Sequence, residues 1–361
     1  MNPFQAFVEK WKPLLPAPLL LVIAFVVYLF FRKVWRELDE DALLARAESH
    51  AKGKADLRPF VALLMMAIIL AMQEYYGNRI WFDVAVVPLL KKYETTHPGF
   101  QFTRYDELVE FGWWSFSRGA GYLLPFFLWR FFFPKDSLRD FGLRTKGFYD
   151  HVWIYGLFLA AVVPAMFIVA QAPDFGTYYP FYKQSSRSWF DFLAWEAMYF
   201  AQFFALECFF RGFILGALRR SFGSGAIFAM CVPYCMIHFG KPYLEACGAI
   251  IAGVALGSLS MKTKSIYQGF MLHITVAALM DWLSLRHRKA TPIHWWPRSE
   301  TGLRTLNEIL ADETLRESIA VKVERGAAVI FAALVVFLVI MFRRSRRARL
   351  ERMWLLPVPK P

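Results

Sequence analysis

The chain has 361 residues with a formal net charge of +13, and 57% of its residues are hydrophobic whereas only 20% are charged. Several apolar runs reach the roughly 20 residues that a helix needs to cross a bilayer, so the composition excludes an ordinary soluble globular protein. The Lys and Arg residues cluster beside these runs, a distribution that sets membrane topology and attracts anionic lipids, and we therefore expect no nucleic-acid partner. The four cysteines lie inside apolar runs without a Cys-x-x-Cys pair, so neither a disulfide framework nor a thiolate zinc site is predicted.

The first third of the chain predicts two membrane spans. The apolar run 14–31 meets Arg32 and Lys33 directly and lacks a small-residue cleavage site, so we interpret it as a retained anchor helix rather than a signal peptide. Residues 32–58 are charged and have the spacing of an amphipathic helix on the cytoplasmic membrane surface. A second span is expected at 59–76, followed by a polar and aromatic outer loop up to about residue 110.

The remainder of the chain predicts seven further spans and a second surface helix. The spans are expected at residues 111–133, 151–170, 189–218, 225–239, 243–261, 266–285 and 326–342. Gly253 and Gly257 have the small-xxx-small spacing that lets membrane helices approach closely. The charged segment 286–325 has apolar residues spaced for an amphipathic helix, and an arginine-rich tail follows the last span.

These elements predict an all-α, polytopic membrane bundle of about eight or nine transmembrane helices. We expect four regions: N-terminal helices in 1–110, a core in 111–285, an extramembrane segment in 286–325, and a last span with a basic tail in 326–361. The charge distribution puts the N-terminus outside and the C-terminal arginines in the cytoplasm. The expected location is a bacterial inner membrane.

Glu207 and Arg211 form an acid and base pair inside the apolar span 189–218. Residues four apart lie one turn apart on one helix face. Charged groups at membrane depth cost roughly 2.5 kcal/mol or more each, so they face protein or a wet cavity and indicate functional use. A purely structural clamp between helices is the alternative for this pair.

Further polar residues in the later spans are expected to converge with this pair. His238, Glu245, His273 and Asp281 come from consecutive helices. Carboxylates and imidazoles around a wet pocket can polarise water, move its proton and stabilise an oxyanion, which is the chemistry of peptide hydrolysis. They are also ordinary zinc ligands, so a metal site stays the less favoured alternative. Taken singly, each histidine is more often a hydrogen-bonded core residue.

The motifs on these helices resemble the CPBP family of intramembrane endopeptidases, which takes its name from CAAX prenyl proteases and bacteriocin-processing enzymes and is also called Abi. The family shows Glu-Glu-x-x-x-Arg, Phe-x-x-x-His and His-x-x-x-Asn motifs. Glu207 and Arg211 match the first motif, Tyr234 and His238 match the second with Tyr for Phe, and His273 matches the third. The resemblance covers roughly residues 111–285 and includes Phe141-Gly142-Leu143-Arg144.

Two motif positions differ from the family. Leu206 stands where the first Glu is expected, and Ala277 stands where Asn is expected. The sequence therefore predicts either an inactive relative or a rebuilt site. Rebuilding is favoured because Glu207 is kept, Glu245 supplies another carboxylate, and Asp281 lies two turns beyond His273.

The resemblance implies a metal-free, glutamate-dependent cleavage of a membrane-embedded or lipid-anchored protein near its C-terminus. We expect Glu207, His238, Glu245 and His273 to be catalytic, supported by Arg211, Asp281 and Tyr234, without a cofactor. The expected partners are a membrane-anchored protein substrate and anionic lipids at the basic loops and tail. An inactive scaffold or self-immunity protein that binds membrane partners is the main alternative, and a small-molecule or ion carrier is another.

Overall fold

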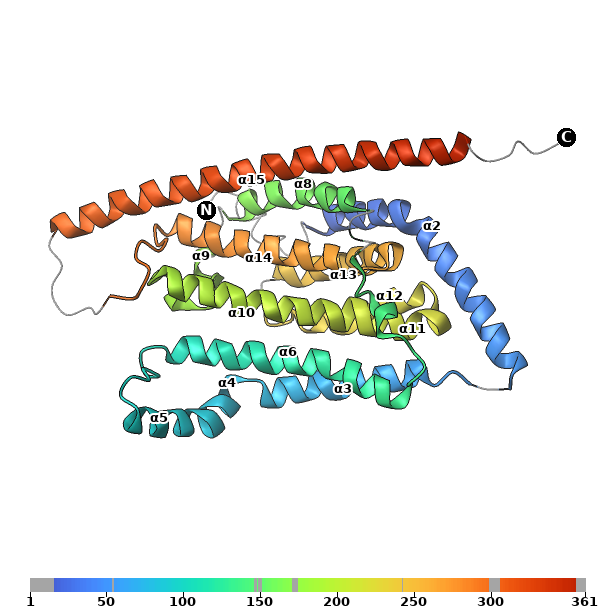
Figure 1. The fold of residues 1–361 in the computed structure, drawn as a ribbon, viewed down its shortest axis with the longest axis horizontal. Coiled ribbons are helices and arrows are strands. Elements are labelled where there is room, and N and C mark those ends of the chain that lie inside the picture. The colour runs from blue at the N-terminus through green and yellow to red at the C-terminus, as the bar shows by residue number, and fades with distance from the viewer. Residues whose placement is uncertain are drawn as a thin grey trace, which may run out of the picture. The chain divides into compact units, whose positions relative to one another are not determined.

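The computed structural model describes residues 16–53, 55–145, 148, 151–170, 175–241, 243–298 and 306–354. Within these ranges every regular element is a helix (Figure 1), so the predicted all-α class is confirmed. The α-helices are α2 Pro16–Ala51, α3 Arg58–Tyr76, α4 Arg79–Trp81, α5 Val87–Thr96, α6 Asp106–Phe132, α8 Val152–Val169, α9 Phe175–Tyr178, α10 Trp189–Glu207, α11 Leu215–Phe222, α12 Gly225–Met236, α13 Tyr243–Thr263, α14 Tyr267–His287 and α15 Leu306–Trp354. Two π-helical segments, Phe82–Val86 and Cys208–Ile214, and two 3-10 segments, Leu138–Phe141 and Lys183–Ser186, complete the set.

Three described helices are long and apolar enough to cross a membrane: Arg58–Tyr76, Trp189–Phe222 and Glu245–Thr263. Two shorter apolar helices, Val152–Pro164 and Gly225–Met236, accompany them. These helices indicate an integral membrane protein. The count of eight or nine spans stays a prediction, as do the four sequence regions and the sidedness.

The predicted spans from 59–76 to 266–285 each coincide with a helix to within a few residues. Two predictions of separate elements were wrong. The anchor and the surface helix expected after it form one continuous helix, α2, and the second surface helix and the last span form one helix, α15. The start of the predicted anchor at Leu14, and Leu303 in the second amphipathic pattern, lie outside the described residues. In α2 the change from apolar to charged composition carries no Gly or Pro that would end a helix. In α15 Gly326 stands at the change from charged to apolar composition, and the helix continues through it.

The described chain divides into two compact units. Unit 1 comprises residues 1–72, 120–148 and 205–269, and unit 2 comprises residues 73–119, 149–204 and 270–361.

Unit 1 is built on α12 and α13, with α2 and α11 packed beside them. An added Cβ at Gly253 would lie 2.8 Å from Cys231 Sγ, and one at Gly257 would lie 2.9 Å from Met230 Cε. The predicted close approach through this glycine pair is therefore confirmed. Trp35 Nε1 donates to Ser258 Oγ at 2.8 Å, which fixes the charged half of α2 against α13 instead of leaving it only on a membrane surface.

The glycines of the segment after Glu207 let the turn at Phe141 pack closely against it. An added Cβ at Gly212 would lie 2.6 Å from Phe141 O, and one at Gly216 would overlap the Phe141 ring. Gly142 follows with a positive φ of 81°, which favours glycine, and its carbonyl accepts from Ile266 N at 3.1 Å. The Phe141-Gly142 stretch thus supports the π-helical segment and the start of α14 within unit 1.

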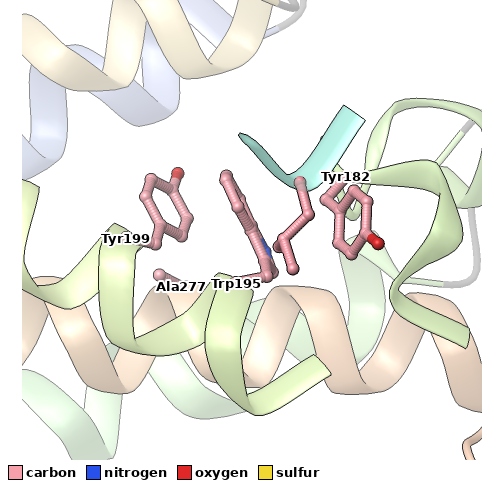
Figure 2. Close-up of a cluster of buried hydrophobic side chains, with 5 residues drawn as sticks. Tyr182, Trp195, Tyr199 and Ala277 are labelled. Atoms are coloured by element: carbon pink, nitrogen blue, oxygen red, sulfur yellow. The ribbon is translucent and has the colours of Figure 1, made fainter. Parts of the chain in front are cut away.

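Unit 2 contains an aromatic core between α10 and α14. Figure 2 shows Trp195 and Tyr199 of α10 beside Ala277 of α14, with Tyr182 on the opposite side of Trp195 from Tyr199. Trp195 and Tyr199 stack with centroids 4.7 Å apart. In the same unit α15 runs along α8 (Figure 1).

Candidate active site

The centre of the candidate site is an ion pair that is fully enclosed in unit 1. Arg211 NH1 lies 3.2 Å from Glu207 Oε1, and the two residues are 1% and 0% exposed. Leaving either charge unpaired at this depth would be costly, so each stabilises the ionised form of the other. The spacing of four residues correctly predicted that the two side chains meet.

A π-helical segment, Cys208–Ile214, begins directly after Glu207 and contains Arg211. Such segments hydrogen-bond from i to i+5 and interrupt the ordinary α-helical ladder, and they occur often at functional sites. Ser260 Oγ of α13 donates to the carbonyl oxygen of Arg211 at 3.3 Å, so a neighbouring helix helps to hold this widened turn. The sequence pattern does not distinguish a π-helix from an α-helix, and the prediction of a regular helix here was incomplete.

Tyr234 of α12 holds the guanidinium from the other side. The Arg211 Cζ atom lies 3.8 Å from the centroid of the Tyr234 ring, a cation–π geometry that suits an enclosed arginine. The ring also packs edge-on against Phe210 at 5.4 Å. The aromatic residue of the second motif therefore orients the arginine of the first.

His238 follows the end of α12 and is only partly buried. Its Nδ1 lies 2.7 Å from the carbonyl oxygen of Tyr234, and its ring lies 4.9 Å from the Tyr234 ring. A carbonyl only accepts hydrogen bonds, so Nδ1 is the donor in this contact. The contact orients the His238 ring at the end of α12.

Glu245 lies in the first turn of α13 and is paired. Lys241 Nζ donates to Glu245 Oε1 at 2.6 Å, and the Glu245 side chain is 27% exposed. Glu207 differs because its side chain is fully enclosed, and the arginine that pairs with it follows on the same helix. The structure thus distinguishes the two carboxylates by their burial, which the sequence pattern could not do.

The sequence pattern missed Gly269 at the start of α14. A Cβ added at this position would lie 3.0 Å from Glu207 Cδ and closer still to Oε2. The Glu207 carboxylate therefore rests directly against the backbone of Gly269, within unit 1. No local signal marks this glycine, because the partner carboxylate is distant in the sequence.

The third-motif residues lie in unit 2. The His273 ring stacks on Phe203 of α10, with centroids 5.0 Å apart and planes 8° apart. Ala277, one turn later, is packed among the aromatic rings of Figure 2. The position where the family has a polar Asn is thus part of an apolar cluster.

Asp281 is part of a buried acidic cluster in unit 2. Trp195 Nε1 donates to Asp281 Oδ2 at 2.6 Å. The carboxyl group of Glu196 interacts with that of Asp281, and both residues are buried. The sequence pointed to Asp281 as a supporting residue but did not identify its partners.

Among the described residues no group of three or more His, Cys, Asp or Glu side chains could hold a metal ion. The four cysteines are free thiols, and Cys231 and Cys235 donate to backbone carbonyls of α13. The zinc alternative therefore finds no ligand cluster in the described part of the chain.

Comparison with known families gives one match. Residues 187–279 match the family described as type II CAAX prenyl endopeptidase Rce1-like. The match runs from the start of α10 to the third motif and contains Glu207, Arg211, His238 and His273, so the resemblance to the CPBP proteases is confirmed over this segment. Comparison with curated proteins and with solved structures found no match.

Proposed function

Because residues 187–279 match the Rce1-like family of CAAX prenyl endopeptidases, we propose that the protein is an intramembrane peptidase that hydrolyses a peptide bond near the C-terminus of a lipid-anchored or membrane-embedded protein. The observation that carries this proposal is the enclosed Glu207–Arg211 ion pair within the matched segment. A pair of buried charges in an apolar helix is expensive, and a reaction that needs an oriented carboxylate accounts for it.

Glu207 acts as the general base in this proposal. It takes a proton from the attacking water as the oxygen forms a bond to the carbonyl carbon of the substrate. Arg211 keeps the carboxylate ionised and oriented, and Tyr234 in turn keeps the guanidinium in place. Gly269 leaves the space in which the carboxylate lies.

His238 and His273 are proposed to serve the tetrahedral intermediate. Glu207 returns the proton to the leaving amine nitrogen as the C–N bond of the substrate breaks, and His238, whose Nδ1 is engaged with a backbone carbonyl, orients the attacking water through Nε2. His273 belongs to the third motif of the matched segment. In this proposal it donates to the developing oxyanion.

Glu245 is proposed to have a secondary role. Its carboxylate pairs with Lys241 at 2.6 Å and is partly exposed, whereas the first-motif carboxylate of Glu207 is fully enclosed. We therefore assign the base to Glu207 and an electrostatic role beside His238 to Glu245.

The two departures from the family pattern are compatible with activity in this proposal. Leu206 is buried in the apolar interior, where a second Glu would need its own partner. Ala277 belongs to the aromatic cluster, so the oxyanion donor must come from His273 alone. The reaction then uses one carboxylate and two histidines.

The test is cleavage of a farnesylated reporter with a CAAX-type C-terminus by the purified protein in proteoliposomes. We expect the reporter to lose its last residues, and we expect Glu207→Gln to lower the rate at least about a hundredfold, within the range for loss of a general base. Lys33→Gln, at an exposed site on α2, is the matched control and should cleave normally. A chelator is expected to leave the rate unchanged. Equal cleavage by the Glu207→Gln variant would overturn the proposal and favour the scaffold alternative.

A further inference from the structure

A basic hollow in unit 1 is separate from the candidate active site. It has a volume of about 840 Å³ and lies between the end of α2, the start of α3 and the end of α11. Arg220 of this hollow lies about 20 Å along the helix axis from Glu207, at a rise of about 1.5 Å per residue. Its basic lining residues are Arg46, His50, Lys52, Arg58 and Arg220.

Two of these cations are already neutralised. Lys52 Nζ lies 2.5 Å from Glu48 Oε1. Arg58 donates to both carboxylate oxygens of Asp136 at 2.8 Å and to Asp56 Oδ1 at 3.1 Å. The acidic residues of the hollow are therefore engaged.

Two arginines from different helices, Arg46 of α2 and Arg220 of α11, line the hollow without a salt bridge to a described residue. Arg220 lies within electrostatic range of Glu48 and Asp136, but these carboxylates are already bound by Lys52 and Arg58. Ser221 lines it as well and donates to Asp56 Oδ2 at 3.1 Å. Two guanidinium groups that converge on one hollow provide the forked donors that match phosphate oxygens.

The rim of the hollow is apolar. Phe60 is 68% exposed and Phe222 is 42% exposed, and both line it. Phe60 lies in the first turn of α3, one of the helices long and apolar enough to cross a membrane. A free phosphate ion would gain nothing from these rings, whereas a lipid would place its acyl chains against them.

We propose that this hollow binds one anionic phospholipid, with Arg46 and Arg220 clamping its phosphate and Phe60 and Phe222 contacting its acyl chains. Basic pockets at the membrane surface between helices recognise headgroups in this way. The bound lipid joins α2 and α11, because its phosphate bridges one arginine from each helix. The inference concerns binding alone and does not depend on the peptidase proposal.

The test is native mass spectrometry of the full-length protein in mixed micelles containing phosphatidylglycerol or phosphatidylcholine. We expect one phosphatidylglycerol molecule to stay bound and phosphatidylcholine to be lost. Arg46→Gln and Arg220→Gln should each lower lipid retention by about tenfold or more, the loss expected for a charge-assisted hydrogen bond. Lys33→Gln on α2, whose side chain is 87% exposed outside the hollow, is the control and should retain the lipid.

Two further arms separate the possible outcomes. Millimolar inorganic phosphate should not displace the lipid. Displacement would overturn the proposed lipid site in favour of a site for free phosphate. Arg46→Lys and Arg220→Lys keep the charge but lose the forked geometry, so they should show intermediate retention even if the Gln variants fail to fold. Equal retention of both lipids by the wild-type protein, or retention by the Arg variants equal to that of Lys33→Gln, would overturn the proposal.

Discussion

Replacing Gly269 by Ala is expected to impair catalysis through the position of the Glu207 carboxylate. The new Cβ would lie 3.0 Å from Glu207 Cδ. Nonbonded carbon atoms prefer about 3.5–4.0 Å, so the carboxyl group must move by about 0.5–1.0 Å. A misplacement of about 1 Å at a reacting group can cost about a hundredfold in rate, and we expect a fall in kcat of about 10- to 100-fold with little change in KM.

The stability of the helix does not account for such a loss. Ala has a higher helix propensity than Gly by about 0.5–1 kcal/mol, so α14 itself should not be weakened. Gly248→Ala in α13 is the matched control, because an added Cβ there meets nothing within 4 Å. The assay compares reporter cleavage in proteoliposomes with the thermal unfolding of each variant.

A double variant tests whether the two positions act on each other. Glu207→Asp shortens the side chain by one methylene and draws the carboxylate away from the new methyl group. If the clash is the cause, adding Gly269→Ala to Glu207→Asp should cost little further activity, because effects at residues in contact are not additive. Losses that multiply, or a Gly269→Ala variant with wild-type kcat, would refute the reasoning.

Three other predictions follow from separate contacts. Ala277→Asn should lower the free energy of unfolding by about 1–3 kcal/mol, because a larger polar group enters the aromatic cluster of unit 2; a Tm equal to that of wild type would contradict this. Arg58 donates to Asp136 and thereby lowers the pKa of that carboxyl group, so its stabilising contribution is present above about pH 4 and is lost as the pH falls through the lowered pKa. The Tm difference between wild type and Asp136→Asn should accordingly be full at pH 7 and shrink as the pH falls below about 4, and a constant difference would show that the ion pair is not responsible. Glu245→Gln should keep a larger share of the cleavage rate than Glu207→Gln, since Glu245 is partly exposed outside the first motif whereas Glu207 is fully enclosed within it, and an equal loss in both variants would indicate that the two carboxylates share the role.

The sequence predicted the parts of this molecule that depend on local spacing. The apolar runs located α3, α6, α8, α10, α12, α13 and α14, and the spacing of four residues predicted the contact between Glu207 and Arg211. The Gly253 and Gly257 pair likewise predicted the close packing of α12 on α13. Each of these features can be read from residues on one helix: their spacing shows which side chains meet, and a pair of glycines shows where another helix can approach closely. The stretch predicted as an outer loop after α3 was wrong in part, because it contains the helices α4 and α5.

The parts that the sequence did not predict depend on partners distant in the chain. The packing of Gly269 against Glu207 requires α14 to meet the end of α10, and nothing near Gly269 signals it. The pairing of Asp281 with Trp195 and Glu196 also arises only when two helices pack. The π-helical segment has the same composition as an apolar α-helix, so hydrophobic periodicity does not reveal it.

The central claim is that Glu207 activates water to hydrolyse a peptide bond near the C-terminus of an anchored protein. The most direct measurement is the intact mass of a farnesylated CAAX-type reporter after incubation with the protein in water enriched in oxygen-18. The account predicts a shortened reporter whose new C-terminal carboxylate carries one oxygen-18 atom, and it predicts an unchanged reporter with Glu207→Gln. A reporter that stays intact with both proteins, or that is shortened equally by both, would contradict the account.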